Sequence, residues 1–144
     1  MQKIMPFLWF DGQAEEAMNF YVSVFKNSKV ISASPMSCTF ELEGLTFYAL
    51  NGGPHFKFNP AVSMFVDCED QKEVDDLWGK LTSGGGKESQ CGWLEDKYGL
   101  SWQIIPKILG ELMSDPDPAR AQRAVQAMLG MQKIDIAALK KAAG

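Results

Sequence analysis

The side chains that could act as a nucleophile and its base are few in this sequence. His55 is the one histidine among 144 residues, and it lies in a segment rich in glycine and proline. Cys91 with His55 could form a thiol–imidazole pair of the kind used in nucleophilic catalysis. The competing interpretation is that Cys38, Cys68 and Cys91 are reduced, mostly buried thiols, because no two of them have C-x-x-C spacing. A single histidine also argues against a zinc knuckle.

Aromatic and polar side chains in predicted strands could instead hold a small molecule. The candidates are Trp9, Tyr48, Trp93 and Gln103. Successive side chains of a strand point to opposite faces, so Tyr48 and Gln103 lie opposite Phe47 and Trp102, which precede them. If Phe47 and Trp102 pack under helices, Tyr48 and Gln103 point to the other side and could line a cavity. Ordinary core packing is the alternative for most of the aromatic residues.

Two repeats indicate that these candidates belong to a duplicated module. Residues 44–48 (G-L-T-F-Y) return as residues 99–103 (G-L-S-W-Q), 55 positions later. A second repeat lies at a distance of 56: Phe10, Asp11, Met18, Tyr21, Val22 and Phe25 return as Val66, Asp67, Val74, Leu77, Trp78 and Leu81. We expect the seam between two such modules to form a cavity.

The hydrophobic pattern predicts the order β-α-β-β-β in each half. The first half has expected strands at 4–10, 29–34, 36–42 and 45–50, with a helix at 13–25. The second half has expected strands at 61–66, 86–90, 91–95 and 100–105, with a helix at 70–81; its second strand is open. Capping signals predict tail helices from 114–118 to about 128 and from Asp135 to 140. The prediction is an α+β domain of paired modules at residues 1–106 (about 1–52 and 60–106), followed by a helical tail at 107–144.

Composition and motifs exclude several partner classes. The net charge is −4 and the pI is about 5.0, without a basic stripe, so nucleic acid is not an expected partner. No segment approaches the ~20 apolar residues that span a bilayer, and the apolar start is too short for a secretory signal, so a cytoplasmic protein without a membrane partner is expected. The glycines at 84–86 follow a helix and lack the phosphate-loop pattern, and no G-x-G-x-x-G motif is present.

Several motifs together resemble one family. They are P-F-L-W-F-D-G at 6–12, C-G-W-L at 91–94, D-K-Y-G-L-S-W-Q-I-I-P at 96–106, S-D-P-D-P at 114–118 and K-I-D-I-A-A-L at 133–139. They are similar to the PhnB-like branch of the vicinal oxygen chelate, or glyoxalase/bleomycin resistance, superfamily. Its members often carry the label 3-demethylubiquinone 3-methyltransferase. The resemblance implies two modules that form an open, cupped mixed sheet around a cavity, and a homodimer.

The resemblance also implies where a divalent metal would sit in an enzyme of this superfamily. The positions match Tyr48 and Gln103 on the final strands, and Pro6 or Phe7 and Ala61 or Val62 on the opening strands. Only Gln103 is a plausible ligand, and one neutral amide cannot hold a divalent ion against water. The nearby carboxylates of Glu41, Glu43, Glu95 and Asp96 are expected beside turns, exposed to solvent. We therefore expect no metal and no other cofactor, and the absence of a nucleotide-binding pattern argues against methyl transfer from S-adenosylmethionine.

The leading hypothesis is a binding protein for a small apolar or aromatic molecule. Its expected ligand-binding residues are Trp9, Tyr48, His55, Cys91, Trp93 and Gln103. The alternative is an enzyme: a metal-dependent lyase, isomerase or dioxygenase with misaligned ligands, or a metal-free enzyme using Cys91 and His55. A third possibility concerns the tail, whose amphipathic helices either dock on their own domain or dimer mate, or bind another protein.

Overall fold

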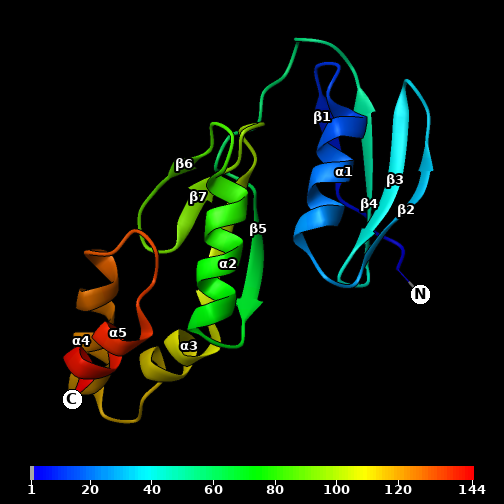
Figure 1. The fold of residues 1–144 in the computed structure, drawn as a ribbon. Coiled ribbons are helices and arrows are strands. Elements are labelled where there is room, and N and C mark those ends of the chain that lie inside the picture. The colour runs from blue at the N-terminus through cyan, green and yellow to red at the C-terminus, as the bar shows by residue number, and fades with distance from the viewer. Residues whose placement is uncertain (1) are drawn as a thin grey trace. The chain divides into compact units, whose positions relative to one another are not determined.

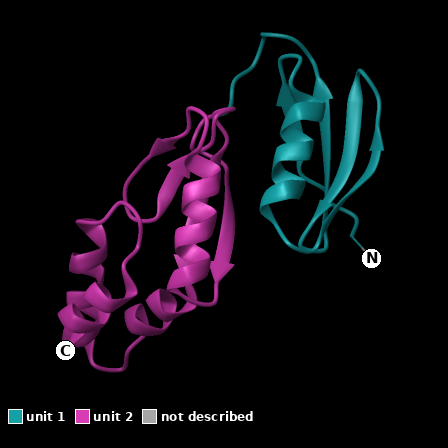
Figure 2. Cartoon of the chain, viewed as in Figure 1, with its two compact units in different colours: residues 1–58 teal, residues 59–144 magenta. Residues whose placement is uncertain are grey.

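The protein consists of two compact units, seen in a computed structural model that describes residues 2–144. Unit 1 covers residues 1–58 and unit 2 covers residues 59–144 (Figure 2). Each unit contains a four-stranded mixed sheet with a helix packed on one face (Figure 1). Both sheets have the same connectivity, which confirms the predicted α+β class built from two β-α-β-β-β modules.

Unit 1 follows the predicted order closely. Its elements are β1 (Phe7–Phe10), α1 (Ala14–Val24), β2 (Ser28–Ala33), β3 (Ser37–Leu42) and β4 (Leu45–Asn51). The strands lie in the order β1-β4-β3-β2, with β1 parallel to β4 and the other pairs antiparallel. Under α1, the buried Tyr21 contacts Phe40, and Phe40 stacks on Phe47 with ring centroids 5.4 Å apart. The opposite face of this sheet has no helix.

Unit 2 repeats the arrangement with shorter second and third strands. Its elements are β5 (Ser63–Cys68), α2 (Gln71–Thr82), β6 (Lys87–Glu88), β7 (Trp93–Glu95) and β8 (Ser101–Pro106). The order is β5-β8-β7-β6, again with a parallel outer pair. Asp70 caps α2 by accepting a hydrogen bond from the Glu73 backbone N–H at 2.9 Å, which satisfies one unpaired donor of the first turn. Trp102 is buried under α2, as predicted for the face opposite Gln103.

The first strands of the two units correspond at a different distance along the chain from the one that the sequence repeat predicted. Tyr48 pairs with Phe7, and its counterpart Gln103 pairs with Phe65, so β1 and β5 correspond at a distance of 58 positions. The expected match of Phe10 with Val66 at a distance of 56 is therefore wrong. The counterpart of the buried Phe10 at the corrected distance is Cys68, which is also buried. A shift of two residues keeps every side chain on the same face, which is why the sequence pattern did not expose it.

The tail helices share a core with the end of the unit 2 sheet. We call the sheet of unit 1 sheet 1 and the sheet of unit 2 sheet 2. The helices are α3 (Lys107–Met113), α4 (Pro118–Leu129) and α5 (Ile136–Ala143). Their buried residues pack with Ile105 of β8, so the tail docks within unit 2. The Gln71 side chain joins this tail to α2 through the Ile134 carbonyl at 3.0 Å and the Ile136 N–H at 2.8 Å. Asp135 caps α5 as predicted, whereas α3 was not predicted.

A buried carboxylate holds the turn between β7 and β8. Asp96 is only 3% exposed, so the expectation of a solvent-exposed side chain there is wrong. One carboxylate oxygen accepts the Tyr98 and Leu100 backbone N–H groups at 2.9 and 3.1 Å. The other accepts the Trp102 indole N–H at 2.9 Å. These bonds compensate the burial of the charge, which would otherwise be costly. They also explain why the motif at 96–106 contains both an aspartate and a tryptophan.

Within residues 2–144, no helix has the length and apolar character needed to cross a bilayer.

Replacing Asp96 with asparagine is expected to lower the free energy of unfolding by about 2–3 kcal/mol. The amide retains one acceptor oxygen but turns an N–H donor toward either the Trp102 indole N–H or the two backbone N–H groups. Urea denaturation measures the change. Asp11→Asn, at an exposed aspartate, is the control and should change the value by less than about 0.5 kcal/mol. Equal effects of the two substitutions would refute the structural role of Asp96.

Candidate functional site

The uncovered face of sheet 1 carries an aromatic pair. Tyr48 on β4 is half-buried and contacts Phe7 of β1 edge to face, with ring centroids 5.7 Å apart. Phe7 itself is 59% exposed, which is unusual for a phenylalanine in a strand. Thr39 of β3 lies level with Tyr48 on its other side. Tyr48 therefore lies away from the helix-covered core, as the alternation predicted.

Trp9 lies on the same face and is held by the loop after β4. Its indole N–H donates to the Gly53 carbonyl at 2.9 Å, and Phe56 contacts its ring edge to face at 4.9 Å. The ring also lies directly over Gly52, where an added Cβ would come within 2.2 Å of the indole. Only glycine fits at that position without displacing Trp9. The polar atom of Trp9 is thus used within the protein, and its ring is held between Gly52 and Phe56.

His55 lies on this loop and is exposed to solvent. Its ring is close to the backbone turn at Gly53, which has a positive φ of 92°. His55 and Cys91 belong to different units, and within the described part of the chain no hydrogen bond or ion pair of the imidazole is found. The thiol–imidazole pair considered from the sequence would join the two units, so it stays a prediction.

The uncovered face of sheet 2 places Gln103 between two aromatic side chains. Gln103 on β8 is level with Phe65 of β5 and with Trp93 of β7. Phe65 is 58% exposed, nearly the same value as Phe7 at the matching position of sheet 1. The amide N–H of Gln103 donates to the Ser63 hydroxyl at 3.0 Å, which orients the side chain and leaves its oxygen available as an acceptor.

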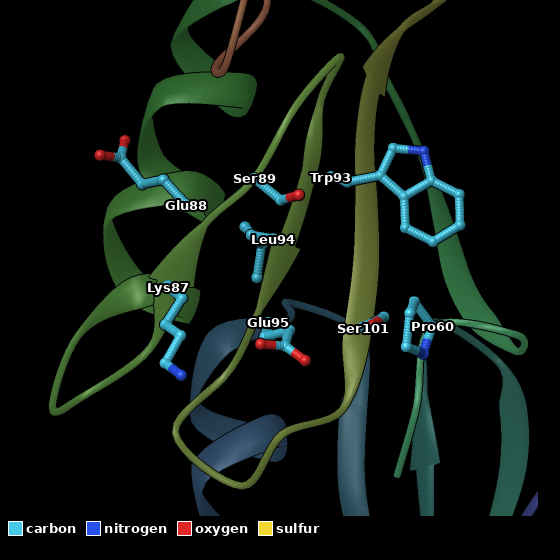
Figure 3. Close-up of a pocket in the computed structure, with 8 residues that line it drawn as sticks. All are labelled: Pro60, Lys87, Glu88, Ser89, Trp93, Leu94, Glu95 and Ser101. Carbon is cyan, nitrogen blue, oxygen red and sulfur yellow. The ribbon is translucent and has the colours of Figure 1, made fainter.

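A pocket of about 280 Å³ adjoins Trp93 on unit 2 (Figure 3). Its lining residues are Pro60, Lys87, Glu88, Ser89, Trp93, Leu94, Glu95 and Ser101. Ser101 is almost completely buried, yet its hydroxyl has no hydrogen-bond partner among the described residues. Trp93 is the one residue of this lining that the sequence analysis selected. The sequence analysis did not select Phe65, Ser63 or Ser101, and it named Phe7 only as a position on the opening strand. Strand alternation places all four on the same faces as the selected residues.

The three cysteines have different environments. Cys91 lies in the turn before β7 with a positive φ of 58°, and its backbone N–H donates to the Met131 carbonyl. Its side chain is partly exposed. Burial raises the pKa of the Cys38 thiol, and Glu15 adds to the rise. Burial, together with the surrounding carboxylates, raises the pKa of Cys68 from 9.0 to about 12. Cys38 and Cys68 are therefore the buried thiols expected, and Cys91 is the accessible one.

The donors at the superfamily's metal positions do not fit a divalent cation. The final strands offer the phenol of Tyr48 and the amide of Gln103, which already binds Ser63. Ser63 and Phe65, one to four positions after the expected Ala61 or Val62, are the residues of the opening strand that lie beside Gln103. Ser63 and Phe65 supply neither an imidazole nor a carboxylate, the donors that such ions require. Across residues 2–144, no group of three histidine, cysteine, aspartate or glutamate side chains could hold a metal ion.

The three glutamates that the sequence analysis expected beside turns differ in exposure. Glu43 is exposed, as expected, and accepts a hydrogen bond from the Asn27 backbone N–H at 3.0 Å. Glu41 and Glu95 are partly buried on the uncovered faces, each level with a hydroxyl-bearing residue of the last strand. Their expected full exposure is therefore wrong, because the neighbouring strands cover part of each side chain.

Thiol labelling at pH 8 is expected to modify Cys91 first in the folded protein. Cys38 and Cys68 are buried with raised pKa values, so they present little reactive thiolate at that pH. Peptide mass spectrometry after brief treatment with iodoacetamide identifies the modified position. Unfolding in urea should make all three react at similar rates. Labelling of Cys68 as fast as Cys91 in the folded state would contradict the assignment.

Comparison with known proteins identifies the family. A family model described as 3-demethylubiquinone-9 3-methyltransferase matches residues 2–105. A solved structure from Bacillus cereus, named as a 3-demethylubiquinone-9 3-methyltransferase, PhnB protein, is 37% identical, with a TM-score of 0.67 over 73% of this chain and 99% of that chain. The comparison with curated proteins produced no match.

More distant structures share the fold alone. A glyoxalase-related enzyme from Fulvimarina pelagi is 16% identical, with a TM-score of 0.57 over 76% of this chain and 91% of that chain. A fosfomycin resistance protein from Listeria monocytogenes, solved with Mn(II) and sulfate, is 13% identical, with a TM-score of 0.52 over 71% of this chain and 87% of that chain. The methyltransferase description is a family label that assigns no reaction. The matched region and the Bacillus cereus relative together show that the chain belongs to the PhnB-like, 3-demethylubiquinone-9 3-methyltransferase-like family.

Proposed function

We propose that the protein binds a small, mainly apolar or aromatic molecule on the uncovered faces of its sheets, without a metal ion. The observation that carries this proposal is the exposure of aromatic side chains at matching positions. Phe65 and Trp93 flank Gln103 on sheet 2, and Phe7 contacts Tyr48 on sheet 1. Ligand sites typically combine such apolar surface with a few oriented polar groups.

Each selected residue has a role in this proposal. Trp93 and Phe65 offer ring surfaces to the ligand, and the Gln103 amide oxygen accepts one hydrogen bond from it. On unit 1, Tyr48 offers a phenol and Trp9 a ring already fixed by Gly53. His55 and Cys91 are accessible polar groups at the edges of their own units. The metal-dependent alternative is disfavoured by the donor set, because a phenol, an amide and two phenylalanines make a poor cation site.

Substituting Trp93 with leucine is expected to weaken binding of the neutral aromatic probe 2-naphthol about five- to tenfold, because the ring contact is lost. Gln103→Ala should weaken it about threefold through the lost hydrogen bond. Isothermal titration calorimetry gives both values. Phe20→Leu, on α1 and away from the uncovered face, serves as the control. The binding proposal fails if 2-naphthol does not bind, or if Phe20→Leu weakens its binding as much as Trp93→Leu.

Mass spectrometry of the purified protein after incubation with zinc, nickel and manganese tests the metal-free part of the proposal. The expected result is less than about one-tenth of an ion per chain after gel filtration, since the donor set lacks imidazole and carboxylate groups. An equimolar, tightly held ion would restore the metal-dependent enzyme as the better proposal.

The proposal includes a homodimer in the cytoplasm. Ile4 and Val62, which precede the first strands at matching positions, are 88% and 67% exposed, and exposed apolar residues often mark surfaces covered by a second chain. Three free cysteines without a disulfide suit a reducing compartment. Light scattering after size exclusion should give twice the chain mass of 16.0 kDa. A mass of one chain at micromolar concentration would exclude the dimer.

A further inference from the structure

A row of three functional groups crosses sheet 2 next to the site proposed above. Ser101 on β8 is level with Glu95 on β7, and Glu95 is level with Lys87 on β6. Sheet 1 has the same row of a hydroxyl, a carboxylate and an ammonium group, formed by Thr46, Glu41 and Lys29. The row is thus part of the duplicated module, and the two units use it differently.

In unit 1 a neighbouring side chain binds the backbone of Thr46, at one end of the row. The Gln2 amide accepts the Thr46 backbone N–H at 2.9 Å and donates to the Thr46 carbonyl at 3.1 Å. At the distance of 58 positions that relates the first strands, the counterpart of Gln2 is Pro60. Proline has no side-chain donor or acceptor, so it cannot bind the Ser101 backbone as Gln2 binds the Thr46 backbone. Pro60 instead forms part of the pocket wall.

The pocket also contains an unpaired buried hydroxyl. Ser101 is 1% exposed, and its Oγ makes no hydrogen bond to any described residue. A buried polar group without a partner costs free energy that a bound ligand could recover. This hydroxyl therefore indicates a site for a ligand that supplies a hydrogen-bonding group.

The charges around this hydroxyl are available. Glu88 points away from the pocket centre, and its carboxylate accepts the Trp78 indole N–H at 2.6 Å (Figure 3). Lys87 and Glu95 form no ion pair within the described chain, with each other or with any other residue. One free ammonium and one free carboxylate thus lie side by side on neighbouring strands. A ligand that carries both charges would pair with both of them.

The size and walls of the pocket limit the rest of the ligand. A volume of about 280 Å³ lies just below the ~300–1,000 Å³ typical of drug-sized ligands, so the molecule must be small. Trp93 and Pro60 form the apolar side of the pocket, beyond Ser101 from Lys87 and Glu95 (Figure 3). The order of groups across the pocket is therefore ammonium, carboxylate, hydroxyl and apolar wall.

We propose that this pocket binds a free α-amino acid with an aromatic side chain. Lys87 pairs with the ligand carboxylate, and Glu95, with the Ser101 hydroxyl as second acceptor, binds the ligand ammonium group. The aromatic side chain of the ligand packs against Trp93 and Pro60. This inference rests on the proposed binding function and names its ligand class.

Calorimetric titration of the full chain at pH 7 with three related probes tests the proposal. L-phenylalanine carries both charges, 3-phenylpropionate lacks the amine and phenethylamine lacks the carboxylate. L-phenylalanine should bind about tenfold more tightly than either analogue, because each analogue leaves one charged group of the protein unpaired.

Substitutions identify which residue of the protein binds the ammonium group of the ligand and which binds its carboxylate. Glu95→Gln should weaken L-phenylalanine and phenethylamine about tenfold and leave 3-phenylpropionate unchanged. Lys87→Met should weaken L-phenylalanine and 3-phenylpropionate and leave phenethylamine unchanged. Glu41→Gln, at the matching position of sheet 1, is the control and should change none of the three. Equal effects of Glu95→Gln on all three probes would overturn the assignment.

Ser101→Ala separates binding from folding. Removing an unpaired buried hydroxyl should leave the melting temperature unchanged or raise it, while L-phenylalanine binds about threefold more weakly. A lower melting temperature with unchanged binding would show that Ser101 has only a structural role.

The outcomes also distinguish this inference from the proposed function. If 2-naphthol binds and Trp93→Leu weakens it, but L-phenylalanine has no advantage over its analogues, only the amino-acid assignment is overturned. If neither 2-naphthol nor any of the three charged probes binds, both the assignment and the binding function fail.

Discussion

In each unit the first strand runs parallel to the last, and the two faces of each sheet follow from this pairing. Parallel neighbours need a crossover connection, and here α1 and α2 provide it. The crossover helix covers one face of the sheet and buries Phe47 in unit 1 and Trp102 in unit 2. The other face carries Tyr48 in unit 1 and Gln103 in unit 2, and in unit 2 its Ile105 end packs in the tail core. The same constraint thus produces the core and the surface on which we place the ligand.

The two units differ in the polar side chains that bind the turns and strand ends of their sheets. Asp96 satisfies the backbone of the turn before β8 and binds the indole of Trp102 across the same turn. The corresponding turn of unit 1 contains Glu43, which is exposed and binds the Asn27 N–H instead. Similarly, Gln2 binds the Thr46 backbone, whereas Pro60 at the matching position has no side-chain donor or acceptor and lines the pocket. The two units therefore have matching backbone positions, and they differ in the polar side chains that bind at these positions.

The chemistry available on these surfaces suits recognition better than metal-dependent catalysis. Gln103 is fixed by Ser63 and presents an amide between Phe65 and Trp93. Cys38 and Cys68 are buried thiols with raised pKa values, and Cys91 is the partly exposed one. The family match and the solved structures establish the fold, and a fold by itself does not fix a function.

The sequence by itself determined the order of elements and the face of each strand residue. Strand alternation and helical periodicity are local patterns, so they placed Tyr48 and Gln103 opposite the core and positioned α1, α2 and α5 within a few residues. Local signals did not reveal α3, since it begins at Pro106 without a capping side chain and is stabilised by its packing in the tail core. Only the tertiary structure decided the register of β5 on β8, the burial of Asp96 and the pocket beside Ser101. Each depends on a partner that the chain brings in from elsewhere, and no local pattern of residues records such a partner.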